Sequence, residues 1–157
     1  MNYWLLKSEA SCYSIDDMHK DTNTWWSGVR NYQARNYMKQ MSVGDLCLFY
    51  HSNGTQSAPT GVYGVVQVSK AAQADTTAQN PNDEHFDPKS TVQNPIWECV
   101  EVSYLTHLKQ PVFLADIKLD PRLTGIIVAS KGSRLSVQPV SRTHFEYIVG
   151  ELGETIL

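Results

Sequence analysis

The sequence predicts an α+β fold, in which a curled, mostly antiparallel sheet or small barrel carries short helices on its outside. Three observations support this prediction. Apolar segments typical of strands recur from residue 2 to residue 140, and short amphipathic helices separate them at irregular intervals, unlike regular βαβ winding. The chain has 157 residues, a length at which one domain buries about two-thirds of its unfolded surface. We therefore expect a single domain over residues 1–157.

The first part of the chain is predicted to hold one strand and two helices. Residues 2–7 (NYWLLK) are a short apolar run between polar residues, which favours a buried strand. A brief helix follows over residues 14–20, because Ser14 and Asp17 have the spacing of a capping box. Asn31 is expected to cap the second helix. The apolar residues of that helix then recur at i, i+3, i+4 and i+7: Ala34, Tyr37, Met38 and Met41.

The middle of the chain is predicted to hold two strands and a long polar excursion. Residues 42–45 (SVGD) form a turn between the second helix and a strand at 46–51, and a further strand covers 61–69. The chain is then polar from residue 71 to residue 95. We interpret this stretch as an excursion and not a domain boundary, because strand signals resume at residue 97.

The last part of the chain alternates between extended and helical patterns. The expected elements are a strand at 97–105, a helix at 114–119, extended segments at 125–130 and 134–140, and a final helix capped by Ser141. Within the segment 134–140, Arg134, Ser136 and Gln138 alternate with apolar residues and should share one face.

Charge is distributed unevenly along this net-acidic chain. The net charge is −3; residues 1–50 carry five basic and five acidic side chains, residues 51–105 carry two and six, and residues 106–157 carry six and five. A protein that grips duplex DNA through many phosphates usually has a basic excess. Any nucleic-acid contact is therefore expected to be local, from a few cationic side chains.

Cysteine spacing and hydropathy set further limits. The three cysteines, Cys12, Cys47 and Cys99, are far apart, and no zinc-binding spacing occurs, so we expect reduced thiols, no metal and no cofactor. The N-terminal residues have no basic lead and only a short apolar run, unlike a signal peptide, and no stretch approaches a membrane span. We expect a cytoplasmic monomer.

The segment TWWSGVRNYQARNYM (24–38) combines aromatic rings with hydrogen-bonding side chains. Trp26 offers a ring on which a flat ligand can stack, and Arg30 can meet a phosphate or the edge of a base. Gly28 permits a tight turn between them, just before the amide groups of a helix N-terminus at Asn31. The alternative is that both tryptophans fill the core and that Arg30 pairs with a carboxylate.

Polar side chains at three other strand ends are further candidates. Lys7 and Ser8 end the first strand, and His51 and Ser52 end another, where His51 is a possible general base. The third group is the polar face of the segment 134–140. Solvated strand ends or an edge strand would give the same patterns. No phosphate-binding glycine loop or hydrolase nucleophile motif occurs.

Several of these segments together resemble the EVE domain family. The matching motifs, in chain order, are YWLLKSE (3–9), YSIDDM (13–18), WSGVRNYQARNYM (26–38), VGDLCLFYHSN (43–53), FDPKS (86–90), NPIWECVEV (94–102) and SRLSVQPV (133–140). The chain resembles single-domain bacterial members of this family. Two positions depart from the family pattern: Ala10 replaces a usual proline, and Ser27 replaces a usual acidic residue, whose carboxylate could accept a hydrogen bond from a base amino group.

The resemblance implies a fold, a ligand class and a set of site residues. The fold is a PUA-like β pseudobarrel with short flanking helices, and related YTH domains hold a methylated adenine in an aromatic cage. EVE domains are thought to bind modified bases, such as 5-methyl or 5-hydroxymethyl cytosine in DNA, or modified bases in RNA. The matching site residues are Lys7, Ser8, Trp26, Val29, Arg30, Asn31, Tyr32, His51, Ser52, Arg134, Ser136 and Gln138.

The predicted function is therefore a binding module, and not an enzyme, for a modified nucleobase in DNA or RNA. The base would stack on Trp26 after leaving its own strand. Two alternatives stay open. One is an RNA-binding accessory protein of PUA type without a requirement for a modified base. The other is a hydrolase of acylated cytidines, similar to members of the ASCH group, with Lys7 and His51 as its minimal apparatus.

Overall fold

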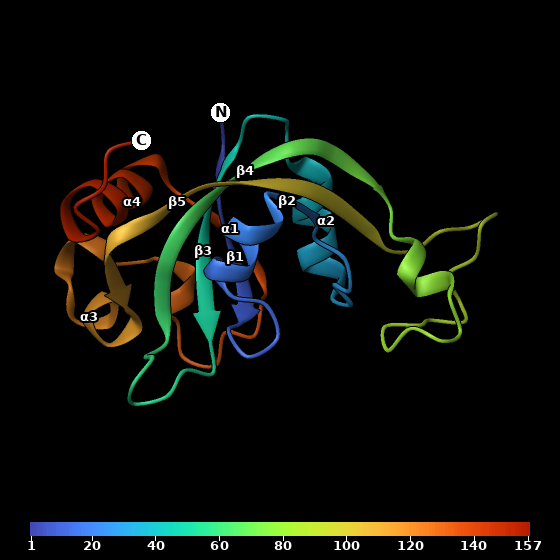
Figure 1. The fold of residues 1–157 in the computed structure, drawn as a ribbon, viewed down its shortest axis with the longest axis horizontal. Coiled ribbons are helices and arrows are strands. Elements are labelled where there is room, and N and C mark those ends of the chain that lie inside the picture. The colour runs from blue at the N-terminus through green and yellow to red at the C-terminus, as the bar shows by residue number, and fades with distance from the viewer.

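The computed structural model describes residues 1–157 and contains one six-stranded mixed sheet with short helices around it (Figure 1). The strand order is β2-β5-β4-β3-β1-β6, and every neighbouring pair is antiparallel except β1 with β3. The predicted α+β class and the mostly antiparallel sheet are confirmed. The sheet is curled but open, because its edge strands β2 and β6 do not pair with each other.

The elements have the following bounds. The strands are β1 (Tyr3–Glu9), β2 (Asn23–Trp25), β3 (Leu46–Ser52), β4 (Gly61–Ala74), β5 (Glu98–Phe113) and β6 (Val137–Val140). The α-helices are α1 (Ile15–Asp21), α2 (Tyr32–Gln40), α3 (Leu114–Leu119) and α4 (Arg142–Glu146), and α4 continues as a π-helical segment, Tyr147–Leu152. Single 3-10 turns cover Thr76–Gln79, Pro121–Leu123 and Ile127–Ala129.

The first strand separates two apolar clusters. Trp4 and Leu6 point into a cluster that includes Met18 of α1 and Met38 of α2, whereas Leu5 points into a cluster with α3 and α4. Successive side chains of a strand face opposite sides, so a strand that is buried on both sides reads as a continuous apolar run. This explains why residues 2–7 show no alternation of polar and apolar residues.

Side-chain caps begin three of the helices as predicted. Ser14 accepts a hydrogen bond from the amide of Asp17, and the Asp17 carboxylate accepts one from the Ser14 amide, which forms the capping box. Asn31 caps α2 by accepting from the amide of Ala34 at 2.9 Å. Ser141 caps α4 in the same way.

The prediction of an extended segment at 125–130 is wrong. Residues Ile127–Ala129 form a 3-10 turn. Gly125 precedes the turn with a φ of 88°, and both Ile126 and Val128 are buried in the cluster beside α3 and α4. A short apolar run bounded by glycine and polar residues does not distinguish one helical turn from a buried strand.

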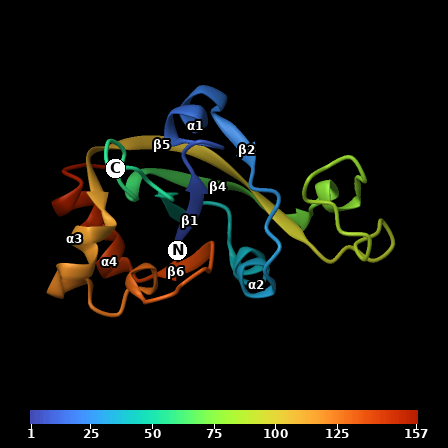
Figure 2. The same ribbon diagram turned by 90° about the horizontal axis from the view of Figure 1, so that it is seen from below.

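Strands β4 and β5 are longer than predicted and carry a projecting segment. The two strands pair as far as Ala74 and Glu98, and the Asp75 amide then donates to the Trp97 carbonyl at 2.8 Å. We call residues 75–97 the arm. It leaves the body at the end of the sheet opposite α3 and α4 (Figures 1 and 2). The predicted polar excursion from residue 71 therefore begins only at residue 75, because residues 71–74 belong to β4.

Candidate functional site

A pocket opens where the end of β1, the segment after β2 and the arm meet. We call it the central pocket. Its volume is about 440 Å³, which falls in the usual range of small-molecule sites. Its lining residues are Lys7, Ser8, Cys12, Tyr13, Thr24, Trp25, Trp26, Ser27, Gly28, Val29, Arg30, His85 and Ser136. Six of the predicted site residues are therefore brought together: Lys7, Ser8, Trp26, Val29, Arg30 and Ser136.

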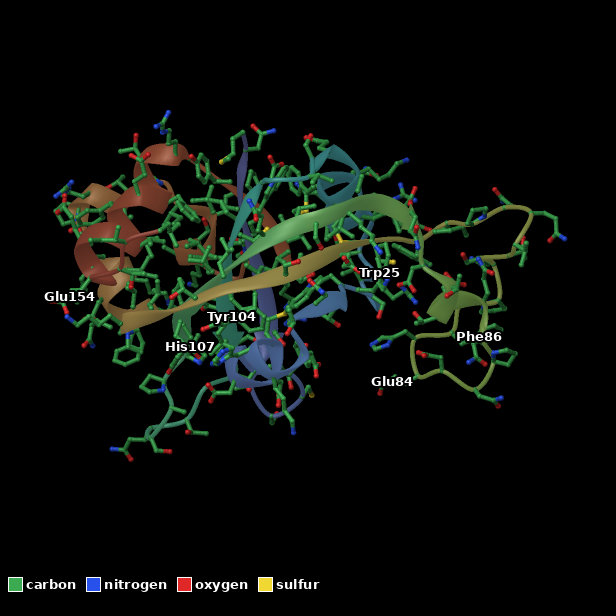
Figure 3. All side chains as sticks on the ribbon, turned by 45° about the horizontal axis from the view of Figure 1, so that its top comes forward. Trp25, Glu84, Phe86, Tyr104, His107 and Glu154 are labelled. Carbon is green, nitrogen blue, oxygen red and sulfur yellow. The ribbon has the colours of Figure 1, made fainter.

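Aromatic side chains form one wall of the central pocket. Trp26 is 8% exposed and packs edge-on against Tyr13 and Phe49, with ring centroids 6.4 and 5.5 Å apart. It is thus part of the core and of the pocket wall at once, so the two alternatives for this residue do not exclude each other. Trp25 and Tyr13 are only partly buried and extend the aromatic wall toward solvent. Figure 3 shows Trp25 on the side of the body that faces the arm, which carries Glu84 and Phe86.

The glycine after the two tryptophans lets the arm approach the pocket. Gly28 has a φ of 85°, and its amide donates to Asp75 Oδ2 at 2.8 Å. A Cβ atom at this position would lie only 2.9 Å from the His85 ring. Glycine therefore satisfies two requirements here, a left-handed backbone and room for the His85 side chain, which closes one side of the pocket.

The Arg30 guanidinium is held by the arm. Its Nε donates to the His85 carbonyl at 2.8 Å, and its two terminal nitrogens donate to Asp75 Oδ2 at 3.0 Å and Thr77 Oγ1 at 3.1 Å. The Asp75 side chain is 1% exposed. Burial opposes ionisation of Asp75, but hydrogen bonds from Thr77, the Gly28 amide and Arg30 together hold its pKa below the usual range. Arg30 thus fixes the arm against the pocket.

The opposite side of the pocket is polar. The half-buried Lys7 donates from Nζ to the Ser133 carbonyl at 3.2 Å, and burial lowers the pKa of its ammonium group. Ser8 donates to the Tyr13 carbonyl at 2.5 Å. On the aromatic wall, burial, and next a hydrogen bond to Asp21, raise the pKa of Tyr13 to about 12, so that wall keeps a neutral phenol. The pocket therefore combines flat apolar rings with a small number of fixed donors.

Three predicted residues on or near helix starts lie outside the central pocket. Asn31 uses its side-chain oxygen to cap α2. Tyr32 is 57% exposed and stacks on Trp97 with centroids 4.8 Å apart. His51 is buried, its Nε2 accepts from the Ile15 amide at 3.0 Å, and burial lowers its pKa. The His51 ring therefore stabilises the start of α1 and is already occupied at the nitrogen that a general base would use.

The other three predicted residues lie near β6 and the end of β3. Ser52 lines a different cavity, described below, and Arg134 is exposed in the segment before β6. Gln138 is 1% exposed and donates to the Leu135 carbonyl at 2.8 Å, while its Oε1 has no hydrogen-bond partner. The predicted alternation of Arg134, Ser136 and Gln138 thus does not place all three side chains in the pocket, because regular extended structure begins only at Val137.

Sequence reasoning missed three features of the site. The first is Tyr13, which lies in a predicted cap region. The others are His85, which closes the pocket, and Asp75, which anchors Arg30. Both belong to the arm, so no local spacing connects them to residues 24–38.

No group of three or more His, Cys, Asp or Glu side chains is placed to hold a metal ion. No helix has both the length and the apolar character needed to cross a membrane.

Comparison with known proteins supplies a family and solved relatives. The EVE domain model matches residues 2–151. Thymocyte nuclear protein 1 of Rattus norvegicus is 36% identical over 94% of this chain and 72% of its own length. A hypothetical protein from Leishmania major has a TM-score of 0.91 at 42% identity, covering 98% of this chain and 95% of that one. Human THYN1 protein in complex with DNA containing 5-methylcytosine has a TM-score of 0.89 at 32% identity, covering all of both chains.

Proposed function

The chain belongs to the EVE domain family, and on this premise we propose that it binds a modified nucleobase, a modified cytosine, in DNA or RNA without catalysing a reaction on it. The human THYN1 complex supports this proposal most directly. It contains DNA with 5-methylcytosine, and that protein shares the fold of this chain from end to end.

The central pocket has the chemistry that a flat ring with polar edges requires. Only 8% of Trp26 is exposed, so we infer that Trp25 and Tyr13 supply most of the aromatic surface that the base contacts. Base–aromatic stacking contributes about 1–3 kcal/mol per base. The Lys7 ammonium and the Ser8 and Ser136 side chains lie along the pocket and can hydrogen-bond the edge of the base. A base in a duplex has to rotate out of its stack to enter.

The charge of the chain favours recognition through the pocket over recognition through the backbone. With a net charge of −3, the protein has no overall attraction for a polyanion. Stacking and edge hydrogen bonds release no counterions, so the preference for the modified base should persist as salt rises.

The arrangement of His51 favours binding over hydrolysis. The cytidine hydrolase alternative pairs Lys7 with His51 as a general base. In the structure the His51 Nε2 accepts from the Ile15 amide, and the ring does not line the central pocket. The one histidine that lines the central pocket is His85, which belongs to the arm.

The test is a binding titration with matched oligonucleotides. Single-stranded DNA and RNA carrying cytosine, 5-methylcytosine or 5-hydroxymethylcytosine at one position are compared, and each mixture is analysed for chemical products. We expect tighter binding of one modified form and no product. Trp25→Ala should remove the preference, whereas Tyr32→Ala, an exposed aromatic outside the pocket, should keep it. Tight RNA binding with equal affinity for cytosine and its modified forms would favour the RNA accessory protein. A chemical product would favour the enzyme.

A further inference from the structure

A second and larger cavity lies on the other side of Lys7. Its volume is about 730 Å³. Its lining residues are Lys7, Tyr50, Ser52, Asn53, Gly54, Thr60, Leu114, Lys118, Val128, Ala129, Ser130, Lys131, Gly132 and Ser133. We call it the lysine cavity. No carboxylate lines it, although the chain as a whole carries more acidic than basic side chains.

Three lysines from distant parts of the sequence converge on the lysine cavity. Lys7 comes from β1, Lys118 from the last turn of α3, and Lys131 from the turn before β6. None of the three forms an ion pair, and no carboxylate lines the cavity beside them. Three positively charged side chains thus line a cavity without a carboxylate, and Coulomb attraction to them favours an anion there.

Neutral hydrogen-bond donors complete the lining. The Thr60 hydroxyl already accepts from the Gly54 amide at 2.8 Å, and the Ser133 hydroxyl accepts from Gln138 at 3.3 Å, so the hydrogen of each hydroxyl remains free to donate. The backbone amides of Lys131 and Gly132 donate no hydrogen bond to the rest of the backbone. An anion with several oxygen atoms, such as a phosphate, matches this set of donors.

The two cavities share Lys7, so a ligand in one cavity would lie next to a ligand in the other. Lys7 lines both the central pocket and the lysine cavity. We propose that the lysine cavity holds a backbone phosphate of the same nucleic acid whose base occupies the central pocket, with Lys118 and Lys131 as phosphate ligands. This inference rests on the proposed function. It also replaces Arg30 as a phosphate contact, because the arm occupies all three nitrogens of that guanidinium group.

The proposal predicts a specific change in salt dependence. Each phosphate contact contributes about −0.7 to the slope of log affinity against log salt on single strands. The double variant Lys118→Gln/Lys131→Gln should therefore have a slope about 1.4 shallower than the wild type. A fourfold increase in salt should then weaken the wild type about sevenfold more than the double variant.

The experiment compares a nucleoside with an oligonucleotide. Wild type, Lys118→Gln/Lys131→Gln and the control Lys39→Gln are titrated with a modified deoxycytidine nucleoside and with a short single strand carrying the same base. Lys39 is exposed, forms no ion pair and lines neither cavity. We expect the double variant to keep nucleoside affinity and to lose oligonucleotide affinity, with the control unchanged. An oligonucleotide with neutral methylphosphonate linkages beside the base should abolish the difference between wild type and double variant.

Other outcomes would overturn the proposal. Equal salt slopes for the double variant and the wild type would show that the lysine cavity contacts no phosphate, even if the base is bound. Inorganic phosphate that protects the wild type against heat but does not compete with the oligonucleotide would show a site for a free anion. Wild type that binds neither nucleoside nor oligonucleotide would instead refute the proposed function itself.

Discussion

Removing the Arg30 side chain tests whether this residue anchors the arm or contacts the ligand. In the wild type the Asp75 side chain is 1% exposed, and in Arg30→Ala its carboxylate loses one of its partners. Breaking a buried ion pair from one side costs about 3–5 kcal/mol. Asp75 keeps hydrogen bonds from the Gly28 amide, the Thr77 amide and the Thr77 hydroxyl. We therefore expect a smaller loss of about 2–3 kcal/mol in the free energy of unfolding.

This loss corresponds to a lower melting temperature. For a domain of this size, 1 kcal/mol shifts the midpoint by about 2–4 °C, so Arg30→Ala should melt about 4–12 °C below the wild type. Asp75→Asn in the Arg30→Ala background removes the unpaired charge and should recover part of the loss. A double-mutant cycle from urea unfolding of these variants measures the coupling between the two side chains.

The pH dependence of the same variants has a definite sign. The folded pKa of Asp75 is held below its unfolded value of about 3.9, so its stabilising contribution is present above pH about 4 and is lost as the pH falls through the folded pKa. The difference in stability between wild type and Arg30→Ala should therefore shrink in acid. Measurements at pH 7 and at progressively lower pH test this.

Binding decides between the two roles of Arg30. An arm that no longer holds His85 over the pocket should weaken nucleoside and oligonucleotide binding alike. If Arg30→Ala instead melts with the wild type and loses affinity only for the oligonucleotide, Arg30 is a phosphate ligand and the assignment to the arm is wrong.

Three further predictions concern the pocket and its surroundings. Trp26→Ala should lower the free energy of unfolding in urea by about 3–5 kcal/mol, because the ring is 8% exposed in the core. Gly28→Ala should destabilise more than Gly125→Ala in thermal unfolding: both positions have positive φ, but only the first Cβ would meet a side chain, the His85 ring. Burial lowers the pKa of His51, so the free energy of unfolding should be highest above pH about 6.5 and should fall as the pH drops from there toward the folded pKa. Urea unfolding of His51→Gln should show a smaller fall over the same range.

Local patterns predicted the helix caps well and the ends of the long strands poorly. The Ser14 and Asn31 caps depend on residues three positions away, so the sequence alone identifies them. The ends of β4 and β5 depend on pairing across the sheet, such as Gln73 with Cys99, and residues 70–74 at the end of β4 are exposed or only partly buried. A strand end that is stabilised by its partner's backbone leaves little trace in hydrophobic periodicity.

Site residues that lie close together in the sequence were predicted, whereas partners that lie far apart in the sequence were not. Trp26, Val29 and Arg30 lie within one segment, and Lys7 with Ser8 lies at a strand end, so motif reasoning identified these five. The sequence did not decide whether Arg30 contacts the ligand or pairs with a carboxylate, because its partner Asp75 is 45 positions away. The lysine cavity was not predicted, since Lys118 and Lys131 reach it only through the packing of α3 and the turn before β6.

The position of β1 between β3 and β6 has a consequence for folding during synthesis. β1 is made before both of its neighbours in the sheet, and its second neighbour, Val137–Val140, is made about 130 residues later. At about 5–20 residues per second, one edge of β1 lacks its partner for on the order of ten seconds. An unpaired apolar edge is a template for association with other chains. The nascent chain should therefore stay sensitive to proteases and dependent on chaperones until β6 leaves the exit tunnel.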